Sequence, residues 1–151
     1  MSASTEAIIV LIRARLLTFA PMGGGSTLAT LLGSRLYHEQ APADATYPYA
    51  VFRLLNRVES DGFSGMRESG DVEILFLDKP RVNEFAAHAA ADVADQAMLD
   101  WNDVTAGIAF SRFRARDTLP PANMSPMDRD LIIVRCLYPV VLWPTYRTQY
   151  A

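Results

Sequence analysis

Cysteine and histidine are nearly absent from this chain of 151 residues. The sequence has one cysteine, Cys136, and two histidines, His38 and His88. One cysteine permits neither an intrachain disulfide nor a multi-cysteine metal site. Zinc sites and activated nucleophiles need several such groups close together, and neither histidine lies in a recognisable motif. We therefore expect no metal, no cofactor and no catalytic residue, with Cys136 in the core and both histidines at surface or interface positions.

Long hydrophobic runs are also missing. The longest, from Leu137 to Trp143, has the length of a strand and contains Pro139, whereas a transmembrane helix needs about 20 apolar residues. The apolar stretch 8–12 has Glu6 before it and arginines directly after it, which reverses the charge order of a secretory signal. We expect neither a membrane span nor a cleaved export signal.

Lysine is almost entirely replaced by arginine. Lys79 is the single lysine among 14 basic residues, and the 17 acidic residues give a net charge of −3. This charge argues against general nucleic-acid binding, which needs a basic excess. Charged residues make up 21% of the chain, below the usual value of about 25%. An arginine-rich, charge-poor surface is typical of protein interfaces, although a GC-rich coding sequence would produce the same bias.

The order of predicted elements indicates one α+β domain over residues 1–151. Apolar spacing of three and four predicts helices, and alternation or a two-sided apolar run predicts strands. The Gly- and Ser-rich stretch 59–70 is expected to be a hairpin loop or arm. Two hairpins separated by a helix predict a mostly antiparallel four-stranded sheet with two main helices packed on it, in the order α-β-β-α-β-β. The expected helices are 7–20 and 81–99, with a short helical turn at 27–32, and the expected strands are 49–58, 71–77, 107–116 and 131–143.

Three local patterns have both a functional and a structural interpretation. Gly23–Thr27 precedes a short helix, but it lacks the spacing and the lysine of a phosphate-binding loop, which favours a linker. Asp71 and Glu73 share one strand face and are interpreted as a solvated face. Arg112, Arg114 and Arg116 share one face of a predicted strand. We expect this row either to pair with carboxylates such as Asp71 and Glu73 or to face a partner.

Short signatures in a fixed order suggest a family. They are a leading helix followed by Leu31-Leu32-Gly33-Ser34-Arg35-Leu36-Tyr37, Ala41-Pro42, Tyr47-Pro48-Tyr49, Phe63-Ser64-Gly65, Asp71-Val72-Glu73-Ile74 and an alanine-rich helix. Together, over residues 5–116, they resemble the tail completion, or tail terminator, proteins of long-tailed bacteriophages.

The resemblance implies a structural virion protein without an active site. Such a subunit forms a ring, with six copies expected, that caps the head-proximal end of the tail tube and joins the tail to the head. The implied partners are other copies of the chain, the tail tube protein and the head-completion or neck proteins. The implied location is the virion neck after assembly in the host cytoplasm. No specific nucleic-acid binding is expected, although the genome would pass through the ring lumen.

A closed ring needs two different interaction surfaces on each subunit. The candidate subunit or partner contacts are Phe63, Met66, Arg112, Arg114, Arg116, Trp143 and Tyr146. Two alternatives stay open. One is another neck or head-completion protein, and the other is a small enzyme or ligand-binding domain with a pocket between the second long helix and the sheet.

Overall fold

The computed structural model describes residues 5–62, 65–79, 86–103, 106–119 and 131–143. Within these residues, seven strands form one mixed sheet in the order β1-β2-β3-β7-β5-β4, and β6 also pairs with β7. The β1–β2 pair is parallel and the other pairs are antiparallel. The strands are β1 (Leu36–His38), β2 (Tyr49–Gly62), β3 (Gly65–Asp78), β4 (Asn102–Asp103), β5 (Ile108–Phe110), β6 (Ala115–Leu119) and β7 (Ile132–Leu142).

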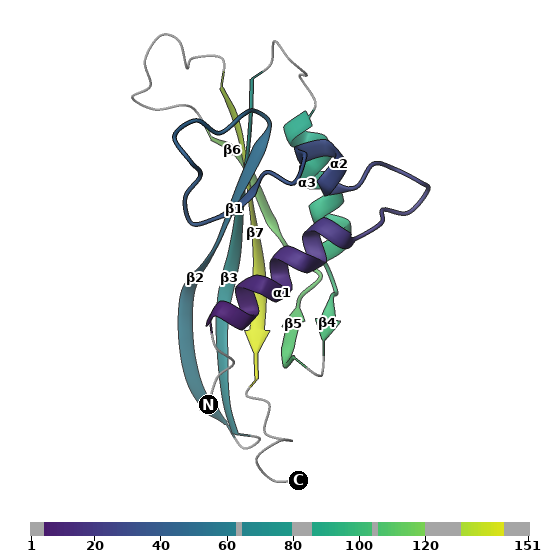
Figure 1. The fold of residues 1–151 in the computed structure, drawn as a ribbon. Helices are drawn as coiled ribbons and strands as arrows, with labels where there is room; N and C mark the ends of the chain where they lie inside the picture. The colour runs from purple at the N-terminus through teal and green to yellow at the C-terminus, as the bar shows by residue number, and fades with distance from the viewer. Residues whose placement is uncertain (1–4, 63–64, 80–85, 104–105, 120–130, 144–151) are drawn as a thin grey trace.

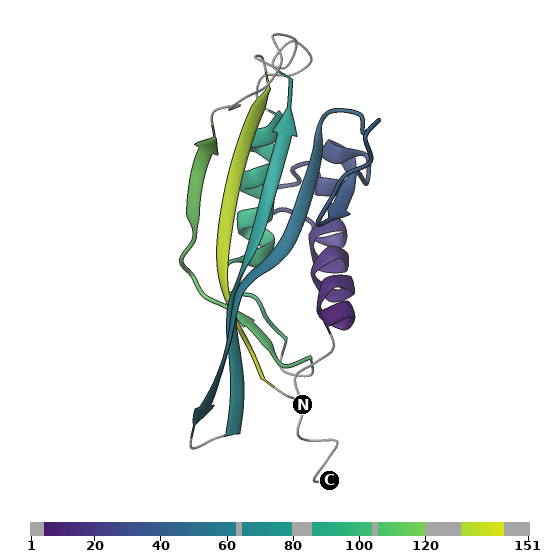
Figure 2. The ribbon, with the colours of Figure 1, turned by 90° about the vertical axis from the view of Figure 1, so that its left-hand side faces the viewer.

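Three helices pack on one side of the sheet: α1 (Thr5–Thr18), α2 (Leu28–Leu32) and α3 (Ala86–Met98). The short helix α2 has clear local causes. The Thr27 hydroxyl accepts a hydrogen bond from the backbone N–H of Thr30 at its start, and Gly33 ends it in the left-handed conformation with φ +57°. In Figure 2 the strands lie in front of α3, and α1 and α2 lie beside β2.

The core lies between the helices and the sheet. Alanines of α3 such as Ala90 and Ala94 are fully buried, and their small side chains let the helix lie close to β3 and β7. Phe52, Phe76 and Tyr138 are the largest buried side chains on the sheet. The expected helical turn at 27–32 and the expected apolar strand at 131–143 are confirmed, the latter as the central strand β7.

The expected four-stranded sheet with two main helices is wrong, because the sheet has seven strands and is mixed. The predicted strand 107–116 is divided into β5 and β6, which pair with different parts of one edge of β7. Between their pairing registers lies Pro139. Proline lacks the N–H needed for a sheet ladder, so the interruption falls where β7 has no donor to offer. The short strands β1 and β4 add the remaining strands.

Of the two forms expected for 59–70, a hairpin loop or an arm, the arm is confirmed and the loop is wrong, because the described residues continue β2 and β3 as a paired hairpin. A bulge between Leu55 and Val58 shifts the register, and Asn56 there has φ +56°. Gly70 lies opposite this bulge, where an added Cβ would come within 3.1 Å of the Leu55 carbonyl oxygen. Figure 1 shows β2 and β3 extending past α1 at the lower end of the molecule. We call residues 58–62 and 65–69 the hairpin arm.

Candidate assembly surface

The sheet has one face toward the helices and one face that no described helix covers. In one row across the sheet, Phe52, Ile74 and Cys136 are opposite one another and at most 1% exposed. In the adjacent row, Arg53, Glu73 and Leu137 point to the other side. We call this second side the open face. Its residues on β2, β3 and β7 are Val51, Arg53, Leu55, Asp71, Glu73, Leu75, Leu77, Ile133, Arg135, Leu137, Pro139 and Val141.

The open face is apolar at its centre and holds one buried carboxylate. The side chains of Leu75 and Leu137 are half-buried. Glu73 is 3% exposed because two arginines lie against it. Arg53 Nε donates to Glu73 Oε1 at 2.6 Å, and Arg135 Nε donates to Glu73 Oε2 at 2.8 Å. Both carboxylate oxygens are therefore satisfied, as a buried charge requires.

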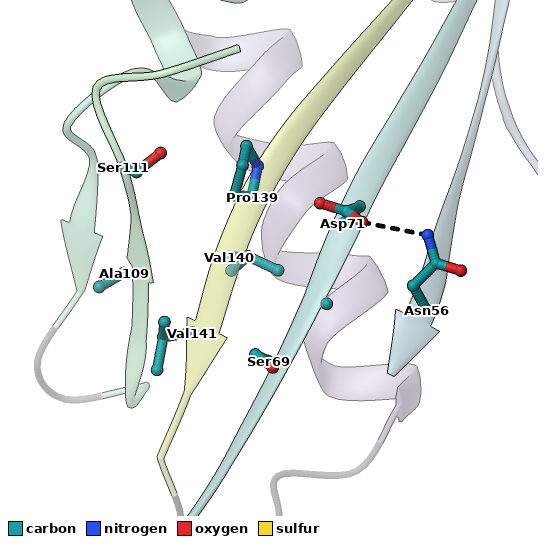
Figure 3. Close-up of a pocket in the computed structure, with 9 residues that line it drawn as sticks. Asn56, Ser69, Asp71, Ala109, Ser111, Pro139, Val140 and Val141 are labelled. Atoms are coloured by element: carbon teal, nitrogen blue, oxygen red, sulfur yellow. Dashed lines mark hydrogen bonds between the residues drawn. The ribbon is translucent and has the colours of Figure 1, made fainter. Parts of the chain in front are cut away.

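Further along the open face, where β5 ends, the surface forms a shallow hollow of about 310 Å³. Figure 3 shows Pro139 and Val141 on β7 between Ser111 on one side and Ser69 and Asp71 of β3 on the other. The Asn56 amide donates to Asp71 Oδ2 at 3.1 Å across the rim. No histidine, lysine or cysteine lines the hollow. It offers apolar side chains, two serine hydroxyls and the Asp71 carboxylate as contacts.

The structure does not place the three predicted arginines in one row. Arg112 and Arg114 lie in the connection between β5 and β6, and only Arg116 is on a strand. Their partners are carboxylates at α3 and directly after it, not the expected Asp71 and Glu73. Arg114 Nε donates to Asp95 Oδ2 at 2.7 Å, and Arg116 donates to both Asp92 and Asp95. Arg112 lies 3.5 Å from Asp100 and its side chain is 77% exposed.

Asp95 also fixes the centre of the covered face. The Tyr138 hydroxyl donates to Asp95 Oδ1 at 2.6 Å. Burial, together with the neighbouring thiol and carboxylate, raises the pKa of Tyr138 above its usual range. Cys136 is fully buried, as expected, and burial raises the pKa of its thiol. The Tyr138 hydroxyl and the Cys136 thiol are therefore neutral. Asp95 attaches α3 to β7 through its hydrogen bond with Tyr138, and to β6 and the segment before it through Arg116 and Arg114.

The other predicted contact residues are placed differently. Trp143 follows β7 and is 41% exposed. The backbone of Met66 pairs with Asp61 in the hairpin arm. Phe63, Tyr146 and the side chain of Met66 lie outside the described residues. The interface role of all four stays a prediction.

Neither histidine belongs to a cluster of ligands. His38 Nε2 is 3.8 Å from a carboxylate oxygen of Glu39, and its ring packs against Phe52. His88 is half-buried on α3. Across the described ranges, no group of three or more His, Cys, Asp or Glu side chains could hold a metal ion. In the same ranges, no helix combines the length and apolar character needed to cross a membrane.

Sequence reasoning missed the Arg53–Glu73–Arg135 cluster. Glu73 was expected on a solvated strand face, and this is wrong because its side chain is 3% exposed. Alternation along β2 places Arg53 on the same strand face as the apolar residues Val51 and Leu55. The cluster forms only through the register of the β2–β3 hairpin with β7, a strand that is distant in sequence. No spacing within a single strand indicates that register.

Comparison with known proteins identifies the fold. No family model matches the chain, and no curated protein matches it in sequence. Among solved structures, the chain is similar to a chain in the virion of a native gene transfer agent particle, with 15% sequence identity and a TM-score of 0.63. The similarity covers 87% of this chain and 90% of that chain. The chain therefore has the fold of a protein that occurs in a phage-like particle.

Proposed function

We propose that the chain is a structural subunit of a phage-like virion. The observation that carries the proposal is the shared fold with a gene transfer agent virion chain over nearly the full length of both proteins. A match of this extent compares whole domains rather than one common motif. The open face, which joins apolar side chains to a fixed arginine pair, is the kind of surface that a subunit covers on assembly.

The specific role we propose is that of a tail terminator. In this role the chain forms a ring at the head-proximal end of the tail tube and joins the tail to the head. The ring would lie in the virion neck after assembly in the host cytoplasm. Its partners would be other copies of the chain, the tail tube protein and a head-completion protein. The resemblance of residues 5–116 to that family supports this role, and the virion fold is compatible with it.

The shape of the subunit suits a ring. Each copy in a ring must present two different surfaces, one to each neighbour. The open face is one such surface. The hairpin arm is the other, because it extends from the domain and its Val58 side chain is 58% exposed. A two-stranded hairpin is only marginally stable by itself in water, so packing against a neighbour would stabilise the arm.

We propose no enzymatic role. The hollow on the open face lies on the opposite side of the sheet from α3, so it does not correspond to the pocket expected between helix and sheet. Its polar residues are an asparagine, an aspartate and two serines. The Asp71 carboxylate is bonded to Asn56 and not to either serine. This arrangement favours binding through surface contacts.

The proposal is tested by mixing the purified chain with tail tubes from the same particle and imaging them by negative-stain electron microscopy. We expect rings on one end of each tube. The purified chain alone should sediment as a ring of several 16.7 kDa copies when concentrated. A chain that stays monomeric and leaves tubes bare would refute the role.

Particles lacking the gene separate the terminator from another neck protein. Loss of a terminator should leave tails that are overlong or unjoined to heads. Loss of a head-completion protein should instead leave heads that leak their DNA while the tails keep a normal length. The second result would identify the chain as a head-completion protein and not as a tail terminator.

A further inference from the structure

We propose that Arg53 and Arg135 form a carboxylate-binding pair on the open face, which receives an acidic side chain from the adjacent copy in the ring. The inference rests on the proposed ring and names the contact by which one subunit recognises the next. This cluster combines fixed geometry, terminal guanidinium donors without a hydrogen bond to any described residue, and apolar surroundings.

The geometry leaves binding groups available. Each arginine contacts Glu73 through Nε, at 2.6 Å for Arg53 and 2.8 Å for Arg135. Among the described residues, the terminal nitrogens of Arg53 have no hydrogen-bond partner. A terminal nitrogen of Arg135 forms an ion pair with Asp117 at 4.0 Å, which exceeds hydrogen-bond distance. Two guanidinium groups are thus held in position through Nε, with terminal N–H donors that make no hydrogen bond to a described residue, the form that suits a carboxylate.

The charges are unequal at the centre of the cluster. Two arginines share one buried carboxylate, and Asp117 at the edge is 59% exposed to water. The centre therefore carries an excess positive charge. The chain as a whole has 17 acidic and 14 basic residues. A second copy therefore supplies carboxylates in excess of basic groups, and a carboxylate is the group that complements an arginine pair.

The surroundings favour a protein partner over nucleic acid. Val51, Leu75 and Leu137 adjoin the pair on the open face and are half-buried. Protein surfaces that bind nucleic acid present an extended row of basic side chains, because each side chain contacts a phosphate. Here there are two arginines within an apolar area. Arginine fixed among aliphatic side chains is typical of the residues that dominate protein interfaces.

Glu73 gives the pair its stiffness. A free arginine side chain loses much rotamer freedom when it binds. Arg53 and Arg135 are already held by the buried carboxylate, which is 3% exposed, while their own side chains are 47% and 31% exposed. The binding groups are thereby fixed in advance and still reachable, so less entropy is lost on association.

The test compares Arg53→Gln with Arg13→Gln in the full chain. Both changes remove one positive charge from an exposed arginine, but Arg13 lies on α1, in the helix layer. Sedimentation velocity over a concentration series measures the association of copies. We expect Arg53→Gln to weaken association by about tenfold or more, as loss of a charged interface partner does. Arg13→Gln should associate like the unmodified chain.

Two further measurements separate the contact from folding and from charge alone. Arg53→Gln keeps the Glu73–Arg135 pair, so circular dichroism and denaturant unfolding should show a folded chain. Arg53→Lys keeps the charge but loses the planar guanidinium group. The association of its copies should be stronger than that of Arg53→Gln and weaker than that of the unmodified chain.

Three outcomes would overturn the inference. If the unmodified chain forms rings and folded Arg53→Gln forms them equally well, the contact is wrong while the proposed function stands. If Arg53→Gln loses affinity for duplex DNA but assembles normally, the pair serves nucleic acid instead. If the unmodified chain forms no ring at all, the proposed function and the inference both fail.

Discussion

The helix-covered face and the open face of the sheet are formed by alternate residues of the same strands, yet they are composed differently. On the covered face, Phe52, Ile74 and Cys136 are almost fully buried and apolar. On the open face, half-buried aliphatic residues surround a carboxylate that two arginines neutralise. The covered face carries the stability of the single chain, because burial of apolar surface drives folding. The open face leaves partly exposed apolar surface that a partner can cover. The following substitutions test that division, from the largest expected effect to the smallest.

Phe76→Ala on the covered face should destabilise the chain most. Phe76 on β3 is 1% exposed, and removing its ring leaves a cavity between the sheet and α3. We expect the free energy of unfolding to fall by about 3–5 kcal/mol, measured by denaturant titration of the isolated chain. Leu75→Ala, the adjacent residue on the open face, is the matched control and should lower it by about half as much or less. Equal losses at both positions would contradict the division between faces.

Glu73→Gln should have the next largest effect. The amide has one accepting oxygen, and its NH₂ group faces a guanidinium donor in place of the second. Arg53 then lacks an anionic partner among the described residues, and Arg135 keeps only Asp117 at 4.0 Å. We expect a loss of about 1–2 kcal/mol in unfolding free energy, limited because both arginines reach water. Glu39→Gln, at a carboxylate that is 72% exposed, is the control and should change little. A neutral result at Glu73 would mean that the cluster adds nothing to the fold.

Tyr138→Phe should change the pH dependence of stability. The pKa of Tyr138 is raised in the folded chain from 10.0, so the folded state keeps the proton that the unfolded state loses. Its contribution is complete below pH 10 and declines as the pH rises above that value. Unfolding titrations from pH 8 to 11.5 should show no additional slope well below pH 10 and, above pH 10, an additional decline that approaches about 1.4 kcal/mol per pH unit in the unmodified chain. Identical slopes in Tyr138→Phe would show that the buried hydroxyl does not titrate in this way.

Phe113→Ala should have the smallest effect on stability. The side chain is 75% exposed in the connection between β5 and β6. We expect a change within about 0.5 kcal/mol by the same denaturant titration. A larger loss would place Phe113 in the core of the single chain and not on its surface.

The elements with strong apolar patterns were predictable. The strand at 131–143 and the turn at 27–32 follow from an apolar run and from capping residues that act locally. The number of strands was not predictable, because β1 and β4 have only three and two residues. A hairpin arm was one of the two forms expected at 59–70, but its strand pairing was not predictable from glycine and serine, which favour loops, whereas cross-strand pairing holds this segment extended.

The candidate surface was predictable in composition but not in place. Arginine bias and low charge indicated an interface, and the row at 112–116 was its expected position. Pro139 interrupts the edge of β7 there, and residues of α3 bind Arg114 and Arg116. The actual pair, Arg53 and Arg135, is 82 residues apart in sequence and is united only by its strand register with Glu73.

The most direct test measures whether assembly covers the open face. Cys136 is fully buried, so a cysteine introduced as Leu75→Cys should be the main site of maleimide labelling. Ala14→Cys, on the exposed side of α1, gives a matched control. We predict that Leu75→Cys reacts in the dilute, monomeric chain and is protected in the ring on tail tubes, while Ala14→Cys reacts in both states. Equal labelling of Leu75→Cys in the monomer and in the tube-bound ring would contradict the account.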